Sequence, residues 1–481
     1  MPPSTPVPTP TPAPAPLAEI PAPNLQAMHH GVSLLGGWLP VTVEILTAVA
    51  LIAVLARLNR RWWFLWVPLS AAIGVVAALA ARTYMNSEGL ASDPAPIELW
   101  IGIAVAVAAI AVAVFGWRKT QNWRRVVSVL AIPLALTAAL MELNRWVGYY
   151  PTVNSAWGAL TAGPLPNQVD AEALPGLRNT SPTTGKLVEV SIPDSASGFK
   201  HRNEYVYLPP AWFAGATPPK LPVVMMIAGE FNTPADWMRS GNIMPVIDAY
   251  ARDHGGIAPI FVFADSGGRF NNDTECVNGP RGDSADHLTK DVRPYVISQF
   301  GASANASNWA VVGWSMGGTC AVDLTVMHPD LFSVFEDIAG DHGPTAGTKE
   351  QTIDRLYGGD AAQWAAFDPV TVMRAHGPYT GVSGWFEDTA TPTNQKNPYG
   401  QGKRPQGNSP SGFGGHDDVR DSDELGAAQD LCSVAKTVAI DCSIHQLISF
   451  HTWQFASRAF TDALPWIAAQ IHTPEPVPSK S

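Results

Sequence analysis

Gly313-Trp314-Ser315-Met316-Gly317 is the most informative stretch of this sequence. A short apolar run that ends at Val312 precedes it, and a helix-forming run follows from Gly318 onward. A strand, a Gly-x-Ser-x-Gly turn and a helix in this order are typical of a nucleophile elbow, in which the serine projects from a sharp turn. The turn crowds the backbone, so the residues beside the serine must be small, and the glycines meet this requirement. We therefore interpret Ser315 as a catalytic nucleophile rather than as an incidental serine in a glycine-rich turn.

A histidine that could serve as the base for Ser315 lies near the C-terminus. The segment Ile448-Ser449-Phe450-His451 follows a strand-like run, and an apolar helical run begins at Phe455. A base on a loop beyond a strand end can reach a serine hydroxyl and accept its proton. We therefore expect His451 to be the base, with a histidine of a surface loop as the alternative interpretation.

The acid of the triad should lie between the serine and the histidine in the chain, at the end of a strand. Residues 381–388 read as a strand that ends in two carboxylates, so we expect Asp388 to be the acid, with Glu387 as the second candidate. A Pro/Gly/Asn-rich insertion follows at residues 391–415. Three aspartates beyond it could take the place of Asp388: Asp417, Asp418 and Asp421.

Two backbone N–H groups are expected to bind the oxyanion of the reaction. One belongs to Met316, the residue after the nucleophile. The other should come from the loop Ala228-Gly229-Glu230-Phe231, which follows the apolar strand at residues 221–227. Gly229 allows the backbone to turn, so the N–H of Glu230 is the expected second donor, with Phe231 as the alternative. The Glu230 side chain is expected to be solvated or to make an ordering contact.

Four segments together resemble a known family: the Ile227-Ala228-Gly229-Glu230 loop, residues 273–282, the serine elbow and His451-Thr452-Trp453. They resemble the esterase family of α/β-hydrolases, which includes actinobacterial mycolyltransferases, S-formylglutathione hydrolases and feruloyl esterases. The resemblance extends over residues 185–471. It implies the α/β-hydrolase fold, a mostly parallel sheet with helices on both faces, and a serine esterase or acyltransferase activity.

The resemblance also bears on the acid. In mycolyltransferases, whose base also tends to lie in a His-x-Trp context, the acid can precede the histidine by only about thirty residues. That spacing supports Asp417 or Asp418 as alternatives to Asp388. The insertion at residues 391–415 departs from the family pattern, which leaves both the acid and the substrate class open.

Composition limits the classes of partner and cofactor. Of the 481 residues, 46% are hydrophobic and only 15% are charged, which suits a chain with both membrane and soluble parts. The formal net charge of -11 argues against a nucleic-acid partner. The sequence has no zinc-type Cys/His spacing, no phosphate-binding loop and no dinucleotide fingerprint, so we expect neither a metal nor a cofactor.

The N-terminal part of the sequence predicts a tail and a membrane region. Residues 1–31 are rich in Pro, Ala and Thr and are expected to form a disordered tail. The first basic residue is Arg57, which argues against a secretory signal peptide. Four apolar stretches, near residues 33–56, 62–81, 97–117 and 126–144, each approach the roughly 20 residues that cross a bilayer. We therefore predict a four-helix transmembrane region over residues 32–149.

Basic residues in the loops predict how these helices are oriented. Two loops, between the first and second and between the third and fourth spans, are rich in Arg and Lys: Arg57, Arg60 and Arg61, then Arg118, Lys119, Arg124 and Arg125. Such loops remain in the cytoplasm. Both termini and the C-terminal domain are therefore expected on the extracytoplasmic side of a cell membrane.

Residues 150–184 are expected to form a linker, residues 185–472 the hydrolase domain and residues 473–481 a C-terminal tail. Strand-like and helical segments alternate in the domain, which predicts a mostly parallel sheet covered on both faces. All four cysteines lie in this domain. Because the extracytoplasmic side permits disulfides, we expect the pairs Cys276–Cys320 and Cys432–Cys442.

These observations predict a membrane-anchored extracytoplasmic serine esterase or acyltransferase. Ser315 would attack an acyl ester, with a lipid or glycolipid among the candidate substrates, and water or another hydroxyl would accept the acyl group. Membrane lipids are the other expected partners. The alternatives are a non-catalytic envelope or ligand-binding protein built on a hydrolase scaffold, and a transporter or sensor that functions through its spans.

Overall fold

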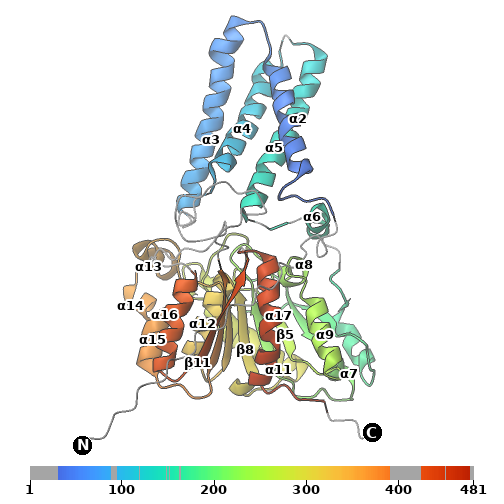
Figure 1. Ribbon diagram of the computed structural model, residues 1–481, viewed down its shortest axis with the longest axis vertical. Coiled ribbons are helices and arrows are strands. Elements are labelled where there is room, and N and C mark those ends of the chain that lie inside the picture. Colours follow the sequence, from blue (N-terminus) through green and yellow to red (C-terminus); the bar gives the residue numbers. More distant parts are fainter. Residues whose placement is uncertain are drawn as a thin grey trace, which may run out of the picture.

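The computed structural model describes residues 31–87, 95–118, 120–147, 149–150, 152–161, 164–390, 424–449 and 451–476. These residues form a helical bundle and an α/β domain, which are stacked along the long axis of the molecule (Figure 1). Nearly all of the expected tail at residues 1–31 and the whole insertion at residues 391–415 lie outside the described residues. The same is true of residues 477–481 and of the alternative acids Asp417, Asp418 and Asp421.

Among the described residues, four helices are long and apolar enough to cross a membrane, in agreement with the four expected spans. They are α2 (Trp38–Leu55), α3 (Val67–Ser87) with the π-helical turn η1 (Trp62–Trp66) before it, α4 (Ile97–Gly116) and α5 (Asn122–Val147). In the bundle α3 packs on α4, α4 on α5, and α5 on α2. Small residues, Ala106, Ala109 and Ala135, occupy one of these helix contacts, which is common where helices associate in lipid.

A nine-stranded sheet forms the centre of the second domain, in the order β1-β2-β3-β5-β4-β8-β9-β10-β11. The strands are β1 (Gln168–Val169), β2 (Lys186–Val190), β3 (Glu204–Leu208), β4 (Val223–Ile227), β5 (Ile260–Ala264), β8 (Trp309–Trp314), β9 (Val334–Ile338), β10 (Ser383–Ala390) and β11 (Asp441–Ile448). Only β3 is antiparallel to its neighbours in this sheet. The remaining pairs are parallel, so their carboxyl ends meet at one edge. This is the α/β-hydrolase fold that the sequence predicts.

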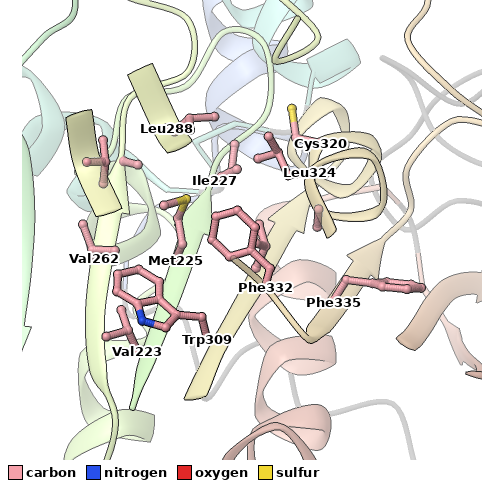
Figure 2. Close-up of a cluster of buried hydrophobic side chains, with 14 of the residues drawn as sticks. Val223, Met225, Ile227, Val262, Leu288, Trp309, Cys320, Leu324, Phe332 and Phe335 are labelled. Carbon is pink, nitrogen blue, oxygen red and sulfur yellow. The ribbon is translucent and has the colours of Figure 1, made fainter. Parts of the chain in front are cut away.

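Helices cover both faces of the sheet, which explains why its strands β4, β5 and β8 are apolar throughout. Val223, Met225 and Ile227 of β4 belong to the core on the side of α12 (Met316–Met327), where Ile227 lies near Leu324 and Val223 near Trp309 (Figure 2). The alternate residues of β4 belong to the core on the opposite face, with α9 (Met244–Asp253) and α17 (Trp453–Gln470). Each face thus has its own hydrophobic core.

The remaining short elements connect and flank the sheet. They are α6 (Val153–Leu160), η2 (Ala171–Leu177), α7 (Pro210–Phe213), α8 (Asp236–Arg239), β6 (Asn278–Gly279), β7 (Gly282–Asp283), α10 (Ser284–Asp286), η3 (His287–Val292), α11 (Arg293–Phe300), η4 (Ala306–Asn308), α13 (Lys349–Tyr357), α14 (Ala361–Phe367), α15 (Pro369–His376) and α16 (Glu424–Thr437). The segment expected as a linker contributes α6, η2 and the edge strand β1, which pairs in parallel with β2. The sheet therefore begins before residue 185.

Both expected disulfides are present. Cys276, in the loop before β6, is bonded to Cys320 of α12, and Cys432 of α16 is bonded to Cys442 of β11. All four cysteines are described and none is free. The first bond ties a loop to the helix that follows Ser315.

Candidate active site

Ser315 occupies a sharp turn between β8 and α12. Its backbone has φ 59° and ψ -123°, a strained conformation for a residue other than glycine. The turn is fixed from both sides: the N–H of Ser315 donates to the carbonyl of Ile338 over 2.9 Å, and its carbonyl accepts from the N–H of Gly318 over 2.7 Å. This is the nucleophile elbow that the sequence predicts.

Close backbone contacts explain the glycines around the serine. A Cβ atom at Gly313 would lie 1.6 Å from the carbonyl oxygen of Gly317. A Cβ atom at Gly317 would lie 2.3 Å from the carbonyl oxygen of Ile227, at the end of β4. Any larger residue would therefore push the elbow away from the neighbouring strand.

The loop after β4 lies directly against the serine. A Cβ atom built on Gly229 would be 3.3 Å from the Cβ of Ser315, so the loop that contains Glu230 borders the nucleophile. On the other side of the serine, Met316 is the first residue of α12, where N–H groups have no partner within the helix. The structure thus brings together the two segments expected to supply oxyanion donors.

An ion pair that the sequence reasoning missed supports this loop. Arg202 binds Asp265 with two nitrogens, over 2.6 and 3.0 Å, and also donates to the carbonyl of Asn232 over 2.9 Å. Burial raises the pKa of Asp265, but the hydrogen bonds and charge of Arg202 outweigh it and hold the pKa below its usual value. The Asn232 N–H closes the loop by donating to Gly229 over 3.0 Å. The sequence does show that Asp265 directly follows the apolar strand β5, and this could have indicated a functional carboxylate.

His451 lies beside the elbow, as expected. Its ring packs on the indole of Trp314, the residue before the serine, with a centroid distance of 4.1 Å. The His451 Nδ1 atom is 2.6 Å from Oε1 of Glu424, the first residue of α16. Both side chains are buried, and the oxygen lies off the direction of the N–H bond. Such imperfect alignment is common at catalytic sites before substrate binds.

Among the described residues, Glu424 is the carboxylate that contacts His451, so the geometry favours Glu424 over the predicted Asp388 as the acid. Asp388 is buried in β10, where it pairs in register with Gln446 of β11. The beginning of α16 instead lies against the histidine. Glu424 precedes His451 by 27 positions (451 − 424), close to the spacing that the family resemblance implies. The sequence reasoning weighed only aspartates in this region and therefore missed it.

Glu387, the second candidate for the acid, has a different environment. It accepts a hydrogen bond of 2.8 Å from the indole of Trp385, which packs near Trp466 of α17. Burial raises the pKa of Glu387 to about 7, against the smaller effect of the Trp385 hydrogen bond. Glu387 therefore belongs to the core beneath α17.

Asp337, at the end of β9, is a further buried carboxylate near the elbow. It accepts from the N–H of Gly340 over 2.8 Å, and a Cβ atom at Gly318 would lie 2.3 Å from its Oδ1. Burial raises the pKa of Asp337 to about 7, the Gly340 hydrogen bond lowers it, and the charge of Glu424 raises it. Two adjacent acidic residues within the short strand β9, Glu336 and Asp337, were the sequence signal for this position.

Among the described residues, one group of side chains has the composition of a metal site: His201, Glu204 and His287. The two ring nitrogens of His201 lie 2.8 and 2.7 Å from the backbone carbonyl oxygens of Arg202 and Ile192. Both nitrogens are therefore directed at backbone carbonyl oxygens rather than at a site shared with Glu204 and His287. The group forms a buried polar network in which Glu204 also accepts from the N–H of Asp265 over 2.9 Å.

Comparisons with known proteins identify the family of this chain. Residues 196–466 match the model of the family described as "Putative esterase". A protein of Corynebacterium glutamicum, itself described as uncharacterized, is 31% identical over 365 residues, which cover 72% of this chain and 82% of that protein.

Solved structures of low sequence identity also match. An S-formylglutathione hydrolase from Agrobacterium tumefaciens is 17% identical, with 61% of this chain and 98% of that chain covered and a TM-score of 0.45. A ferulic acid esterase is 16% identical, with 60% and 99% covered and a TM-score of 0.42. MPT51 of Mycobacterium tuberculosis is 16% identical, with 59% and 99% covered and a TM-score of 0.40. The match to the family model, which spans more than half of the sequence, shows that this chain belongs to the putative esterase family.

Proposed function

We propose that this chain is a membrane-anchored serine esterase or acyltransferase with its catalytic domain on the extracytoplasmic side. The observation that carries the proposal is the arrangement at the elbow. Ser315 stands in a strained turn, His451 packs on the adjoining Trp314, and Glu424 lies against the far nitrogen of His451. A nucleophile, a base and an acid that orients the base are the three parts of a serine triad.

The reaction follows from this arrangement in two steps. Because Nδ1 of His451 faces Glu424, Nε2 is the nitrogen available to take the proton of the Ser315 hydroxyl. The serine oxygen attacks the ester carbonyl, and the N–H groups of Met316 and Glu230 bind the oxyanion that forms. The C–O bond to the alcohol breaks, His451 returns the proton to the alcohol, and the acyl group remains on Ser315.

The second step removes the acyl group by the same chemistry. His451 takes a proton from water or from another hydroxyl, and that oxygen attacks the acyl-serine carbonyl. Collapse of the second oxyanion releases a carboxylic acid or a new ester, and Ser315 regains its proton. Hydrolysis and transfer use the same catalytic residues. The shape of the pocket and the molecules available therefore decide whether water or another hydroxyl accepts the acyl group.

The contacts between the two Arg-rich loops support the proposed orientation. Arg57 donates to the carbonyl of Gly116 over 3.1 Å, and Arg124 donates to the carbonyl of Ala56 over 2.8 Å. Both loops are therefore at the same end of the bundle, and basic loops favour the cytoplasmic side. The catalytic domain follows α5 at the other end, where the environment permits its two disulfides.

Turnover and acyl trapping with the full-length chain test the chemistry. The purified protein should hydrolyse p-nitrophenyl butyrate, and rapid acid quenching should leave a butyryl group on the peptide that contains Ser315. Mass spectrometry locates the group. An acyl group on any other residue would contradict the mechanism.

Thiol labelling in intact cells tests the orientation. The native cysteines are all bonded and do not react, so a single introduced cysteine reports its own side of the membrane. A membrane-impermeant maleimide should label Ser87→Cys, at the end of α3, and leave Thr120→Cys, in the loop before α5, unlabelled, because the two positions are predicted on opposite sides. The reverse pattern would place the catalytic domain in the cytoplasm.

A further inference from the structure

Tyr149 connects the helical bundle directly to the catalytic domain. It follows α5 by two residues, and its hydroxyl donates to Oδ2 of Asp236 over 2.6 Å. The same oxygen accepts from the backbone N–H of Thr233 over 2.7 Å and from its hydroxyl over 3.0 Å. Burial, followed by the charge of Asp236, raises the pKa of Tyr149 well above its usual value, so the phenol remains a donor.

This contact places the bundle at a particular edge of the sheet. Asp236 begins α8 in the loop after β4, the loop that also contains Gly229 beside Ser315. Because β4, β8 and β11 are joined through parallel pairs, this edge also carries Ser315 and His451. The bundle therefore rises from the catalytic edge, with α6 and α8 at the junction (Figure 1).

α6 presents an apolar stripe at this junction. Val153, Trp157 and Leu160 are 39%, 67% and 79% exposed, and their spacing of four and three residues puts them on one side of the helix. α8 packs on the helix from the catalytic domain. Such a stripe, with a tryptophan at its centre, is typical of a helix that lies in a membrane interface.

The start of α6 is fixed to the outer ends of two spans. The N–H of Val153 donates to the carbonyl of Val32 over 2.9 Å, just before α2, and Thr152 forms a bridge with Ser33. α6 also begins only six positions after α5 ends (153 − 147). A bilayer that surrounds α2 and α5 must therefore end next to α6, which identifies lipid as the occupant of its exposed stripe.

A pair of aromatic residues lies near the nucleophile. Phe231, in the loop beside Ser315, packs against Phe270 with a centroid distance of 5.4 Å. Phe270 is 73% exposed. An ester with an apolar acyl chain would meet this pair next to the serine.

We propose that α6 lies in the interface of the outer leaflet and that the Tyr149–Asp236 bond holds the Ser315 edge against the same leaflet. The enzyme then takes its acyl ester from the membrane surface, and its substrate is an amphiphile whose ester group lies in the headgroup layer. This substrate assignment rests on the proposed function, whereas the position of α6 does not.

A label on α6 tests the position. The full-length Leu160→Cys protein, labelled with a nitrobenzoxadiazole fluorophore in phosphatidylcholine vesicles, should be strongly quenched by lipids with a nitroxide near the headgroup. The matched control is Glu475→Cys, beyond the end of α17 that lies away from the bundle, which should be quenched only by a water-soluble quencher (Figure 1). Quenching of Leu160→Cys from water alone would overturn the proposal, as would shielding from both quenchers, which would indicate a protein partner.

A comparison of two substrates tests the consequence. Wild-type protein in vesicles is assayed on soluble p-nitrophenyl butyrate and on a long-chain 4-methylumbelliferyl ester dissolved in the same vesicles. Leu160→Asp should lower turnover of the vesicle ester about tenfold or more, the contribution of one buried leucine side chain, and leave the soluble ester unchanged. Leu160→Met keeps an apolar stripe and should preserve both rates.

The outcomes separate this proposal from the proposed function. An equal loss on both substrates in Leu160→Asp, or no loss on either, would overturn membrane presentation. Absence of wild-type activity on both esters would instead contradict the esterase proposal. The quenching result would still decide where α6 lies.

Discussion

Ile52 and Val114 of the bundle are 66% and 65% exposed, whereas every residue of β4 and β5 in the catalytic domain is buried. The two regions are similarly apolar in sequence, but only the domain removes its apolar side chains from the surface. Apolar side chains exposed on the helices suit a surrounding of lipid. A domain that buries the apolar side chains of its sheet suits a surrounding of water. The same apolar residue types therefore face outward in the bundle and inward in the catalytic domain.

The two regions also differ in where their charged residues lie. In the bundle, Arg145 joins α5 to α2 through Glu44 at 3.2 Å and also binds Glu142 at 2.7 Å. The catalytic domain instead buries carboxylates such as Asp337 and Glu424 around the elbow. Burying a charge is unfavourable, so these groups are expected where they position the catalytic machinery.

The largest expected effect is the loss of ester turnover when the nucleophile is removed, while the helical bundle stays intact. Ser315→Ala should lower ester turnover by a factor on the order of 10⁶, because the nucleophile is lost. The bundle should be unaffected, with unchanged membrane extraction and helical circular dichroism. Ser298→Ala, an exposed serine on α11, is the control and should keep full activity. Substantial activity in Ser315→Ala would exclude a serine mechanism.

The next effect concerns the acid. Glu424→Gln should lower kcat by roughly 10⁴-fold, because the imidazole loses the partner that orients and stabilises it. Asp388→Asn should have a much milder effect, since Glu424 still contacts His451. Steady-state kinetics of the two purified variants provide the comparison. If Asp388→Asn is the crippling change, then Glu424 is not the acid.

A smaller effect is expected from the disulfide beside the elbow. Replacement of Cys276 and Cys320 by alanine releases a cross-link between residues 44 positions apart and should destabilise the catalytic domain by about 2–5 kcal/mol. Hydrogen exchange should accelerate in α12 and remain unchanged in α4. Equal acceleration in both helices would show that the two regions do not unfold independently.

The smallest effect is a dependence of stability on pH. The pKa of Asp337 in the folded protein, about 7, exceeds the ordinary aspartate value of 3.8, so the folded state binds this proton more tightly than the unfolded state does. The contribution of Asp337 to the free energy of unfolding is therefore fully present below about pH 4. It decreases as the pH rises toward 7, by at most about 1.4 kcal/mol per pH unit. Asp337→Asn should flatten that slope in denaturant titrations at pH 5 and pH 7. An unchanged slope would assign the dependence to other carboxylates.

The sequence alone determined the features that depend on a few neighbouring residues. The elbow at Ser315 requires glycines within two or three positions, and the spans require only continuous apolar runs. His451 could be found because it directly follows a strand. The cysteine pairs followed from the side of the membrane and from the elements on which the cysteines lie.

Tertiary structure alone decided which distant groups meet. Glu424, at the start of α16, contacts His451 although 27 positions separate them, and no local pattern specifies this contact. The contacts of Tyr149 with Asp236 and of Arg202 with Asp265 join residues 87 and 63 positions apart. Local backbone geometry is set by steric limits over a short segment, whereas such pairings depend on how whole elements pack. The elbow and the histidine beside it were therefore predictable from the sequence, whereas the contacts of Glu424 and Tyr149 were not.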